Sequence, residues 1–373
     1  MNCSNLRMYN KLKNVLLAYI PNLLKASLSH KVNFLYALLE IKPNSCTVML
    51  TNRCNLKCVM CRQWREPLGQ ELSFDDWKRI ILDLKKNGIR NIHFSGGEPL
   101  LRKDFIELVR FSSQNGFVVG VTTNGTLLTG ALLEELIAVG LRSIALSMDA
   151  VGNEYDRIRG LPNAFEQLNR AAEAVSLKKK KQEVDAYINF TLMKDNIKDL
   201  KSVKSFSDKK GLPLAVCLLD KSSFLFNLEG NSNNLWIKDE KDFLALREAL
   251  DFLVQEKIKA PKSLIINFPA IDFIEHYFRD SRQARIPCVS SQERVIIDPA
   301  GGFLGGCMSL GRFGNIKQNS FKELSALEKY KIAKRNMFYK KCPGCSCGYL
   351  FNLRLFLPSV CMDVAARLKH WRK

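Results

Sequence analysis

Residues 51–61 read TNRCNLKCVMC and place Cys54, Cys58 and Cys61 in a CxxxCxxC spacing directly after an apolar run. Three thiolates this close in one loop can hold a single iron-sulfur cluster. A cubane needs four ligands, so three protein ligands leave one iron open to bind a small molecule, which indicates chemistry. The alternative is a zinc knuckle with a distant fourth ligand, which a short three-cysteine loop suits poorly.

Around this loop, short β-rich runs alternate with amphipathic helical patterns. The expected strands are residues 47–51, 91–94, 117–122, 143–147, 184–192 and 214–219, and the expected helices are residues 74–86, 103–115, 131–139, 164–177, 200–210 and 239–255. This order predicts an α/β fold with a curved, barrel-like parallel sheet whose functional residues follow the carboxyl ends of the strands.

Helix ends are marked by residues with capping chemistry. Ser73 followed by Asp76 is typical of a helix N-terminus, while glycines stand where a C-terminal cap requires a positive φ, at Gly88, Gly116, Gly140 and Gly211. These signals set the expected boundaries between helices and strands.

Further motifs follow the next expected strands. Residues 94–100 read FSGGEPL, residues 122–125 read TTNG, residues 147–149 read SMD, and RIRG follows at 157–160. A Gly-Gly pair alone is an ordinary turn. This pair, however, follows the second expected strand and comes after the cysteine loop in the sequence, which favours a functional role over a simple turn.

Together these motifs resemble the radical S-adenosylmethionine (SAM) superfamily, whose signature is a CxxxCxxC loop after the first strand of a partial (β/α)6 barrel. The resemblance implies a 4Fe-4S cluster on Cys54, Cys58 and Cys61. It also implies that the GGEP motif binds the methionyl amino group of SAM, with glycines that let backbone approach the ligand and a carboxylate acceptor on Glu98. The expected SAM-binding residues are Met60, Gly96, Gly97, Glu98, Pro99, Ser147 and Arg159.

The expected contacts differ among these residues. Met60 stands where the family usually has an aromatic residue over adenine, and a methionine can also cover a flat ring. Ser147 would approach the ribose and Arg159 would pair with the SAM carboxylate, although either could instead be a turn or surface residue.

A second set of cysteines resembles the auxiliary-cluster domain called twitch, a shorter relative of the SPASM domain. Its expected ligands are Cys288, Cys307, Cys342 and Cys345, with a hairpin at residues 295–304 and a helix at residues 320–335. Four thiolates would close a second 4Fe-4S cluster, which then suits electron relay. A zinc ribbon is the alternative. Cys347 and Cys361 read as spare ligands or buried thiols.

These segments predict an organisation in five parts. They are a basic-apolar helical extension (1–46), the radical SAM core barrel (47–235), a helical linker that completes the barrel (236–287), the auxiliary-cluster domain (288–348) and a basic-apolar tail (349–373). Residues 222–234, which are rich in Ser, Asn and Gly, read as a loop.

The formal net charge of +20 indicates an acidic partner, such as an anionic substrate, a nucleic acid or an anionic membrane, or simply solvated lysines as at residues 178–181. No export signal and no apolar run long enough to span a bilayer is visible, so we expect reduced cysteines and a cytoplasmic protein. Residues 15–24 and 349–373 could lie on a membrane surface.

The resemblance implies reductive cleavage of SAM to a 5'-deoxyadenosyl radical that removes a substrate hydrogen, with electrons from an external donor such as flavodoxin or ferredoxin. We expect an oxidoreductase acting on a small-molecule or lipid-linked substrate, because a second cluster that relays electrons suits the removal of an electron from a substrate radical. A peptide-modifying maturase is the second reading. A basic nucleic-acid-binding protein with structural metal sites is an alternative from another class. The substrate is not named by these motifs.

Overall fold

A computed structural model describes residues 42–66, 69–220, 234–280, 288, 290–338 and 341. Most of the expected N-terminal extension, nearly all of the loop at 222–234 and the expected tail lie outside these residues. So do Cys342, Cys345, Cys347 and Cys361.

One nine-stranded sheet forms the centre of the described fold, in the order β6-β5-β4-β3-β2-β1-β7-β8-β9. The strands are β1 (Ser45–Met49), β2 (Asn91–Ser95), β3 (Val118–Thr123), β4 (Leu141–Ser147), β5 (Asp185–Leu192), β6 (Leu214–Leu218), β7 (Arg294–Ile297), β8 (Gly302–Phe303) and β9 (Gly314–Asn315). Every pairing from β6 through β1 to β7 is parallel. The predicted parallel sheet and its six strands are confirmed.

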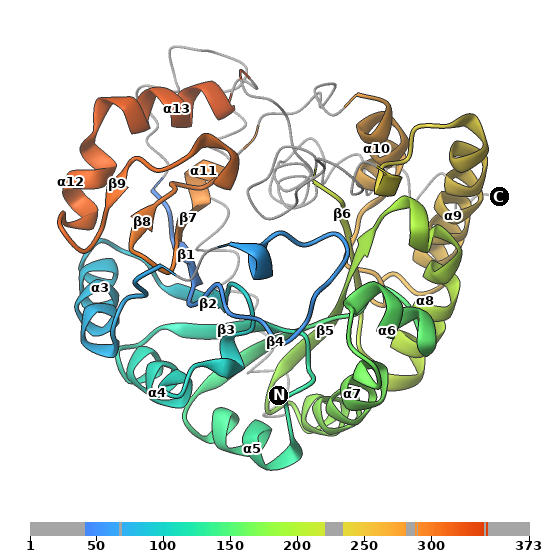
Figure 1. Ribbon diagram of the computed structural model, residues 1–373, viewed down its shortest axis with the longest axis horizontal. Helices are drawn as coiled ribbons and strands as arrows, with labels where there is room; N and C mark the ends of the chain where they lie inside the picture. The colour runs from blue at the N-terminus through green and yellow to red at the C-terminus, as the bar shows by residue number, and fades with distance from the viewer. Residues whose placement is uncertain are drawn as a thin grey trace, which may run out of the picture.

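Helices wrap the outside of this curved sheet, which stays open and does not close into a full barrel (Figure 1). They are α3 (Phe74–Lys86), α4 (Phe105–Gln114), α5 (Gly130–Ala138), α6 (Asn153–Arg159), α7 (Ala164–Lys180), α8 (Leu200–Lys210), α9 (Glu240–Lys259), α10 (Phe268–Arg279), α11 (Ser290–Glu293), α12 (Phe321–Ala326) and α13 (Glu328–Phe338). The partial (β/α)6 barrel is therefore the observed architecture.

The two faces of the sheet differ in chemistry. Along each strand, apolar residues such as Ile92, Phe94, Ile188 and Phe190 are fully buried among the side chains of the core. The alternating positions are half-buried and mostly polar, and they include Thr47, His93, Ser95, Thr122, Ser143, Ser147, Tyr187, Asn189, Thr191 and Cys217. Because helices cover the outer face, these residues lie on the concave face, where a closed barrel would be packed with branched apolar side chains.

Some helices departed from expectation. The single helix expected at 320–335 is wrong, because Leu327 is extended, with ψ of 129°, and separates α12 from α13. Helices α6 and α10 were not predicted. The first is short and follows Gly152, a residue at its N-terminus that has no side chain to cap the helix.

The expected hairpin in the cysteine-rich C-terminal part is confirmed, with Ile297 opposite Phe303 in antiparallel β7 and β8. It does not stand apart from the barrel sheet, because β7 also pairs in parallel with β1. The barrel and the auxiliary part therefore share one sheet, while the expected domain boundaries stay predictions.

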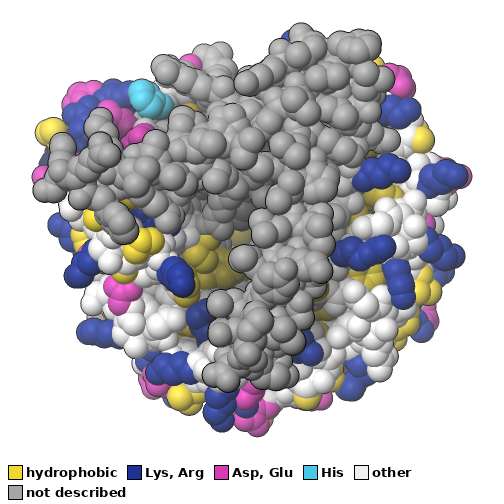
Figure 2. Space-filling view, turned by 180° about the vertical axis from the view of Figure 1, so that it is seen from behind, with side chains coloured by type: hydrophobic (Ala, Val, Ile, Leu, Met, Phe, Trp, Pro, Cys, Tyr) yellow, Lys and Arg dark blue, Asp and Glu magenta, His cyan; other side chains and the backbone are white. Residues whose placement is uncertain are grey.

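Figure 2 shows the described charged side chains on one face of the molecule. Lys and Arg are spread around the visible rim, with Asp and Glu among them. Among the described helices, none combines the length and apolarity that crossing a membrane requires.

Candidate functional site

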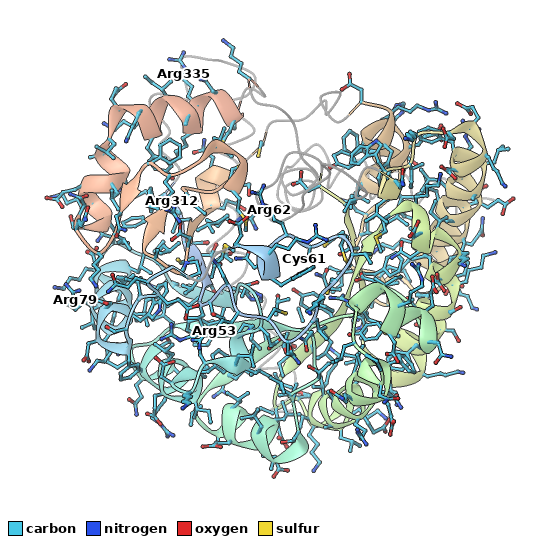
Figure 3. All side chains as sticks on the ribbon, viewed as in Figure 1. Arg53, Cys61, Arg62, Arg79, Arg312 and Arg335 are labelled. Carbon is cyan, nitrogen blue, oxygen red and sulfur yellow. The ribbon has the colours of Figure 1, made fainter. Side chains whose placement is uncertain are left out.

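The cysteine loop leaves the carboxyl end of β1 and crosses the middle of the open barrel, where Figure 3 places Cys61 and the neighbouring Arg62. Backbone hydrogen bonds tie the loop to its neighbours. Gly97 N–H donates to Thr51 O at 2.7 Å, and Glu98 N–H donates to Arg53 O at 2.8 Å. The CxxxCxxC and GGEP motifs, about 40 residues apart in sequence, thus form one structural unit.

Gly96 and Gly97 are required by this contact. A Cβ on Gly96 would lie 2.5 Å from Thr51 O, and a Cβ on Gly97 would lie 2.1 Å from Arg53 O. We expected these glycines to let backbone approach a ligand. The space left by each missing Cβ is instead filled by the cysteine loop, and their contact with SAM stays a prediction.

Glu98 is fully buried, and its carboxylate faces the end of β3. It accepts hydrogen bonds from Thr123 Oγ1 and Asn124 N–H, both at 2.8 Å, and from Leu100 N–H at 3.2 Å. Burial raises the pKa of Glu98 to about 7, although these hydrogen bonds oppose the rise. The carboxylate therefore already joins the GGEP loop to β3, and its expected contact with the SAM amino group stays a prediction.

Asn124 continues this connection back to the cysteine loop. Its Nδ2 donates to Asn55 Oδ1 at 2.9 Å, while Asn55 Nδ2 donates to Thr126 Oγ1 at 2.7 Å. Thr126 N–H in turn donates to Asn124 Oδ1 at 2.9 Å. The sequence showed the TTNG motif after the expected third strand, but it gave no sign that Asn55 bridges two loops.

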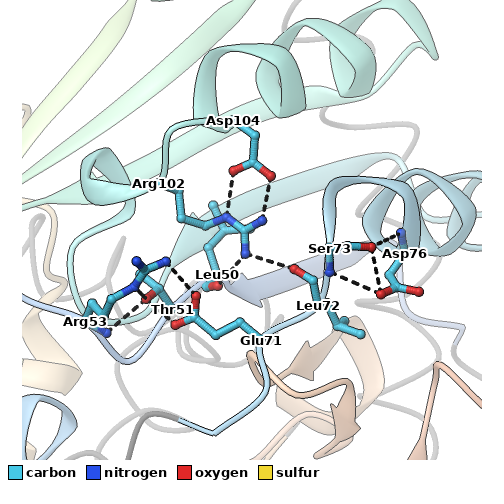
Figure 4. A network of polar contacts seen from close by, with 9 residues as sticks. All are labelled: Leu50, Thr51, Arg53, Glu71, Leu72, Ser73, Asp76, Arg102 and Asp104. Carbon is cyan, nitrogen blue, oxygen red and sulfur yellow. Dashed lines mark hydrogen bonds and ion pairs between the residues drawn. The ribbon is translucent and has the colours of Figure 1, made fainter.

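The base of the cysteine loop is fixed by a second polar network, drawn in Figure 4. Buried Arg102 pairs with Asp104 through two hydrogen bonds of 2.8 and 2.6 Å. Its Nη1 donates to Leu50 O at 3.2 Å and to Leu72 O at 3.1 Å. This fork holds Leu50, just before the loop, against Leu72, two residues before α3, so the loop starts from a fixed point.

Arg159, at the end of α6, turns inward to the cysteine loop. Its Nη1 donates to Cys58 Sγ at 3.6 Å, and its Nη2 lies 2.6 Å from Asp149 Oδ2. Among the described residues, its Nε has no hydrogen-bond partner. The reading of Arg159 as a surface or turn residue is therefore wrong, while its expected pairing with the SAM carboxylate stays a prediction.

The remaining predicted SAM-binding residues lie close to these loops. Met60 is buried in the core, and buried Pro99 begins the short 3-10 helix η2 (Pro99–Leu101). Ser147 is the last residue of β4, half-buried, with its backbone carbonyl accepting from Tyr155 Oη at 3.3 Å. All are placed at the carboxyl edge of the sheet, and their contacts with SAM stay predictions.

The three cysteines suit a cluster by their chemistry. Burial raises the pKa of Cys54 to about 12 and that of Cys61 to about 11, and it also raises the pKa of Cys58. Iron binding would therefore be coupled to proton release. Within the described ranges no three Cys, His, Asp or Glu side chains converge on one metal ion. A cubane does not need such convergence, since each cysteine binds a different iron.

Of the second set of cysteines, Cys288 and Cys307 are described, and both are half-buried. Their chain segments lie against each other, because Ser290 Oγ donates to Gly306 O at 3.3 Å across the β7–β8 hairpin. The hairpin thus brings the neighbourhoods of these two cysteines together.

Comparison with known proteins agrees with this geometry. The model of the radical SAM superfamily matches residues 48–206. A probable GTP 3',8-cyclase of Methanocella arvoryzae is 30% identical over 216 residues, which cover 55% of this chain and 67% of that protein. Fe-coproporphyrin III synthase of Methanosarcina barkeri is 28% identical over 223 residues, which cover 59% of this chain. The match spans only 52% of that synthase.

A solved structure shares the fold. The crystal structure of Streptococcus suis SuiB bound to precursor peptide SuiA aligns with a TM-score of 0.60 at 16% identity, covering 79% of this chain and 67% of SuiB. At this identity the likeness concerns the fold alone. The cysteine loop, the partial barrel and these matches together show that the chain belongs to the radical SAM superfamily of enzymes.

Proposed function

We propose that Cys54, Cys58 and Cys61 hold a 4Fe-4S cluster whose open iron binds SAM, and that the chain removes a hydrogen atom from a substrate in the barrel. The cluster and SAM would supply the radical chemistry when bound. The observation that carries this proposal is the junction of the cysteine loop with the GGEP motif, the TTNG turn and α6. Three loops and a helix that fix one another can position a cofactor before substrate arrives.

The role of the chain's own residues is to hold and orient. Arg102 and Glu98 anchor the loops from below, and neither is exposed to solvent. The radical must meet only the intended C–H bond, so a site of this kind has to exclude water and stray hydrogen donors. Buried anchoring residues serve that requirement because their hydrogen bonds hold the loops in fixed positions.

The concave face of the sheet supports a polar substrate. His93 Nε2 lies 2.7 Å from Thr122 Oγ1, and Cys217 Sγ donates to Asn189 Oδ1 at 3.0 Å. Burial, assisted by the charge of Arg294, lowers the pKa of His93 to about 4, so its ring is neutral at pH 7. Neutral donors and acceptors on this face suit a substrate, or the polar part of a lipid-linked one, that is recognised by hydrogen bonds.

We further propose that the reaction is an oxidation, with the electron passed to a second 4Fe-4S cluster on Cys288, Cys307, Cys342 and Cys345. Support comes from the hairpin that brings the first two cysteines' neighbourhoods together. It also comes from the pairing of β7 with β1, the strand that leads into the first cysteine loop. An external donor such as flavodoxin or ferredoxin would reduce the first cluster, and the basic excess would favour an anionic substrate or membrane surface.

A peptide-modifying maturase is the main competing function. SuiB is known with a bound precursor peptide, but its likeness to this chain concerns the fold alone. The half-buried polar residues of the concave face suit hydrogen-bonding groups of a small molecule and of a peptide equally well. The distinction therefore needs a substrate experiment.

That experiment follows hydrogen transfer. Cells are grown in deuterated medium, and their extract is separated into small-molecule, lipid and polypeptide fractions. Each fraction is then incubated with reconstituted protein, SAM and dithionite. We expect deuterium in 5'-deoxyadenosine only with the small-molecule or lipid fraction. Deuterium transfer from the polypeptide fraction alone would favour the maturase. Cleavage without deuterium from any fraction would contradict the proposed hydrogen abstraction.

A further inference from the structure

A buried ion pair lies directly behind the cysteine loop. Asp149 follows β4 and is fully buried, Arg159 ends α6 and is 7% exposed, and their charged atoms are 2.6 Å apart. The same guanidinium donates from Nη1 to Cys58 Sγ at 3.6 Å. One arginine therefore contacts both a carboxylate and an expected cluster ligand, 101 residues away in sequence.

The pair cannot easily move. Thr191 N–H donates to Asp149 Oδ1 at 2.8 Å, and Asn196 Nδ2 donates to the Asp149 backbone carbonyl at 3.0 Å. On the other side, Lys57 N–H donates to Arg159 O at 3.1 Å. These bonds attach Asp149 to β5 and to the segment after it, and they attach Arg159 to the cysteine loop itself.

Close packing completes this attachment. A Cβ on Gly160 would lie 2.7 Å from Lys57 O, so α6 ends in direct contact with the backbone of the loop. Val59 N–H also donates to Ile158 O at 2.9 Å. The guanidinium is therefore held beside Cys58 by backbone on both sides.

We propose that Arg159 tunes the reduction potential of the cluster held by this loop, and that Asp149 orients Arg159 and offsets part of its charge. The inference rests on the proposed function, since it requires a cluster on Cys58. Reduction adds one negative charge to a cluster. A fixed cation and an N–H···S hydrogen bond to a ligand sulfur stabilise that charge, more so when buried, and so raise the potential.

The two partners give opposite predictions. Arg159→Gln removes the cation and should lower the midpoint potential, with at least a tenfold smaller ratio of reduced to oxidised cluster at the wild-type midpoint. For a one-electron couple this equals about 59 mV. Asp149→Asn removes the offsetting charge and should raise the midpoint. Arg159→Lys keeps the charge but loses the fork, and should fall between Arg159→Gln and wild type.

The measurement is an electron paramagnetic resonance redox titration without SAM, with iron content determined for each variant. Arg157→Gln is the matched control, because it removes the same charge from the same helix at a half-exposed position, where solvent screens it. If Arg159→Gln does not assemble a cluster, Asp149→Asn and Arg159→Lys decide the question, since each keeps a cation beside Cys58.

Equal midpoints in wild type, Asp149→Asn and Arg159→Lys, or a shift of Asp149→Asn to lower potential, would overturn the inference. That failure differs from failure of the proposed function. In the latter case wild-type protein would show no cluster signal on this loop, and Cys58→Ala would leave the spectrum unchanged.

Discussion

At the scale of residues, the site depends on contacts between side chains far apart in sequence. The three cysteines and the GGEP motif were predictable, because their spacing is itself the signal. The partners of Glu98, Asn55 and Arg159 were not. Glu98 meets Thr123 and Asn124, 25 and 26 residues away, and such pairings arise only when the strands are placed side by side.

Glu98→Gln tests this network. The Gln amide has only one acceptor oxygen, so at least one of the buried groups that donate to Glu98 loses its hydrogen-bond partner. Leaving such a group unpaired costs about 1 to 3 kcal/mol. We expect SAM affinity to fall about tenfold or more, while iron content holds because the cysteines are untouched. Calorimetric SAM titration and iron analysis measure both quantities.

Glu107→Gln on α4 is the control for this variant, because the Glu107 side chain is 55% exposed and pairs with Arg110 on the surface. Lost iron with unchanged SAM affinity in Glu98→Gln would mean that the network serves the cluster loop and not SAM binding.

At the scale of elements, helix boundaries were predictable where capping chemistry is local. Helix α3 spans the predicted residues because Ser73 and Asp76 form a reciprocal capping box and Gly88 follows with a φ of 90°. Helix α6 was missed because it is short and has no side-chain cap, although it carries Arg159. It packs against α7 and accepts backbone hydrogen bonds from Lys57 and Val59 of the cysteine loop, and no local sequence pattern reveals these contacts.

Asp76→Ala should destabilise α3 and the part that packs on it. Burial opposes ionisation of Asp76, but hydrogen bonds from Ser73, Lys317 and Arg79 outweigh it and hold the pKa of Asp76 well below its usual range. We expect a loss of about 1 to 3 kcal/mol in the free energy of unfolding at pH 7. Urea unfolding measures it.

The same variant has a predictable pH dependence. A depressed pKa contributes stability above the unfolded value near 4, and this contribution is lost as pH falls toward the folded value. The difference in free energy of unfolding between wild type and Asp76→Ala should therefore become smaller below about pH 4. The Asp75 side chain is 82% exposed, so Asp75→Ala should change the free energy of unfolding little at any pH. A gap that widens in acid would contradict the assigned hydrogen bonds.

At the scale of the whole molecule, the sequence predicted the order of β and α elements but not the continuity of the sheet. The parallel pairing of β1 with β7 joins residues about 250 positions apart, and neither strand carries a signal for the other. Phe321 N–H donates to Asp83 Oδ2 at 2.6 Å, and Lys317 reaches Asp76 at 3.1 Å. The C-terminal part is thereby attached to α3 and to β1.

The proposed second cluster should be separable from the first despite this attachment. A Cys342→Ala, Cys345→Ala double variant should lose about half of the iron, if each site holds one four-iron cubane. It should still form 5'-deoxyadenosine, but without oxidised product if the second cluster accepts the substrate electron. Full product formation by a variant that lacks the second cluster would argue against electron relay and for a redox-neutral reaction.

The central claim is that the loop of Cys54, Cys58 and Cys61 holds the cluster that cleaves SAM. The most direct measurement is anaerobic 5'-deoxyadenosine formation by reconstituted protein with dithionite, compared with single alanine variants of these cysteines. Cys46→Ala is the matched control, since Cys46 lies on β1 before the loop. We predict turnover by wild type and Cys46→Ala and none by the three loop variants. Wild-type output from any loop variant would contradict the claim.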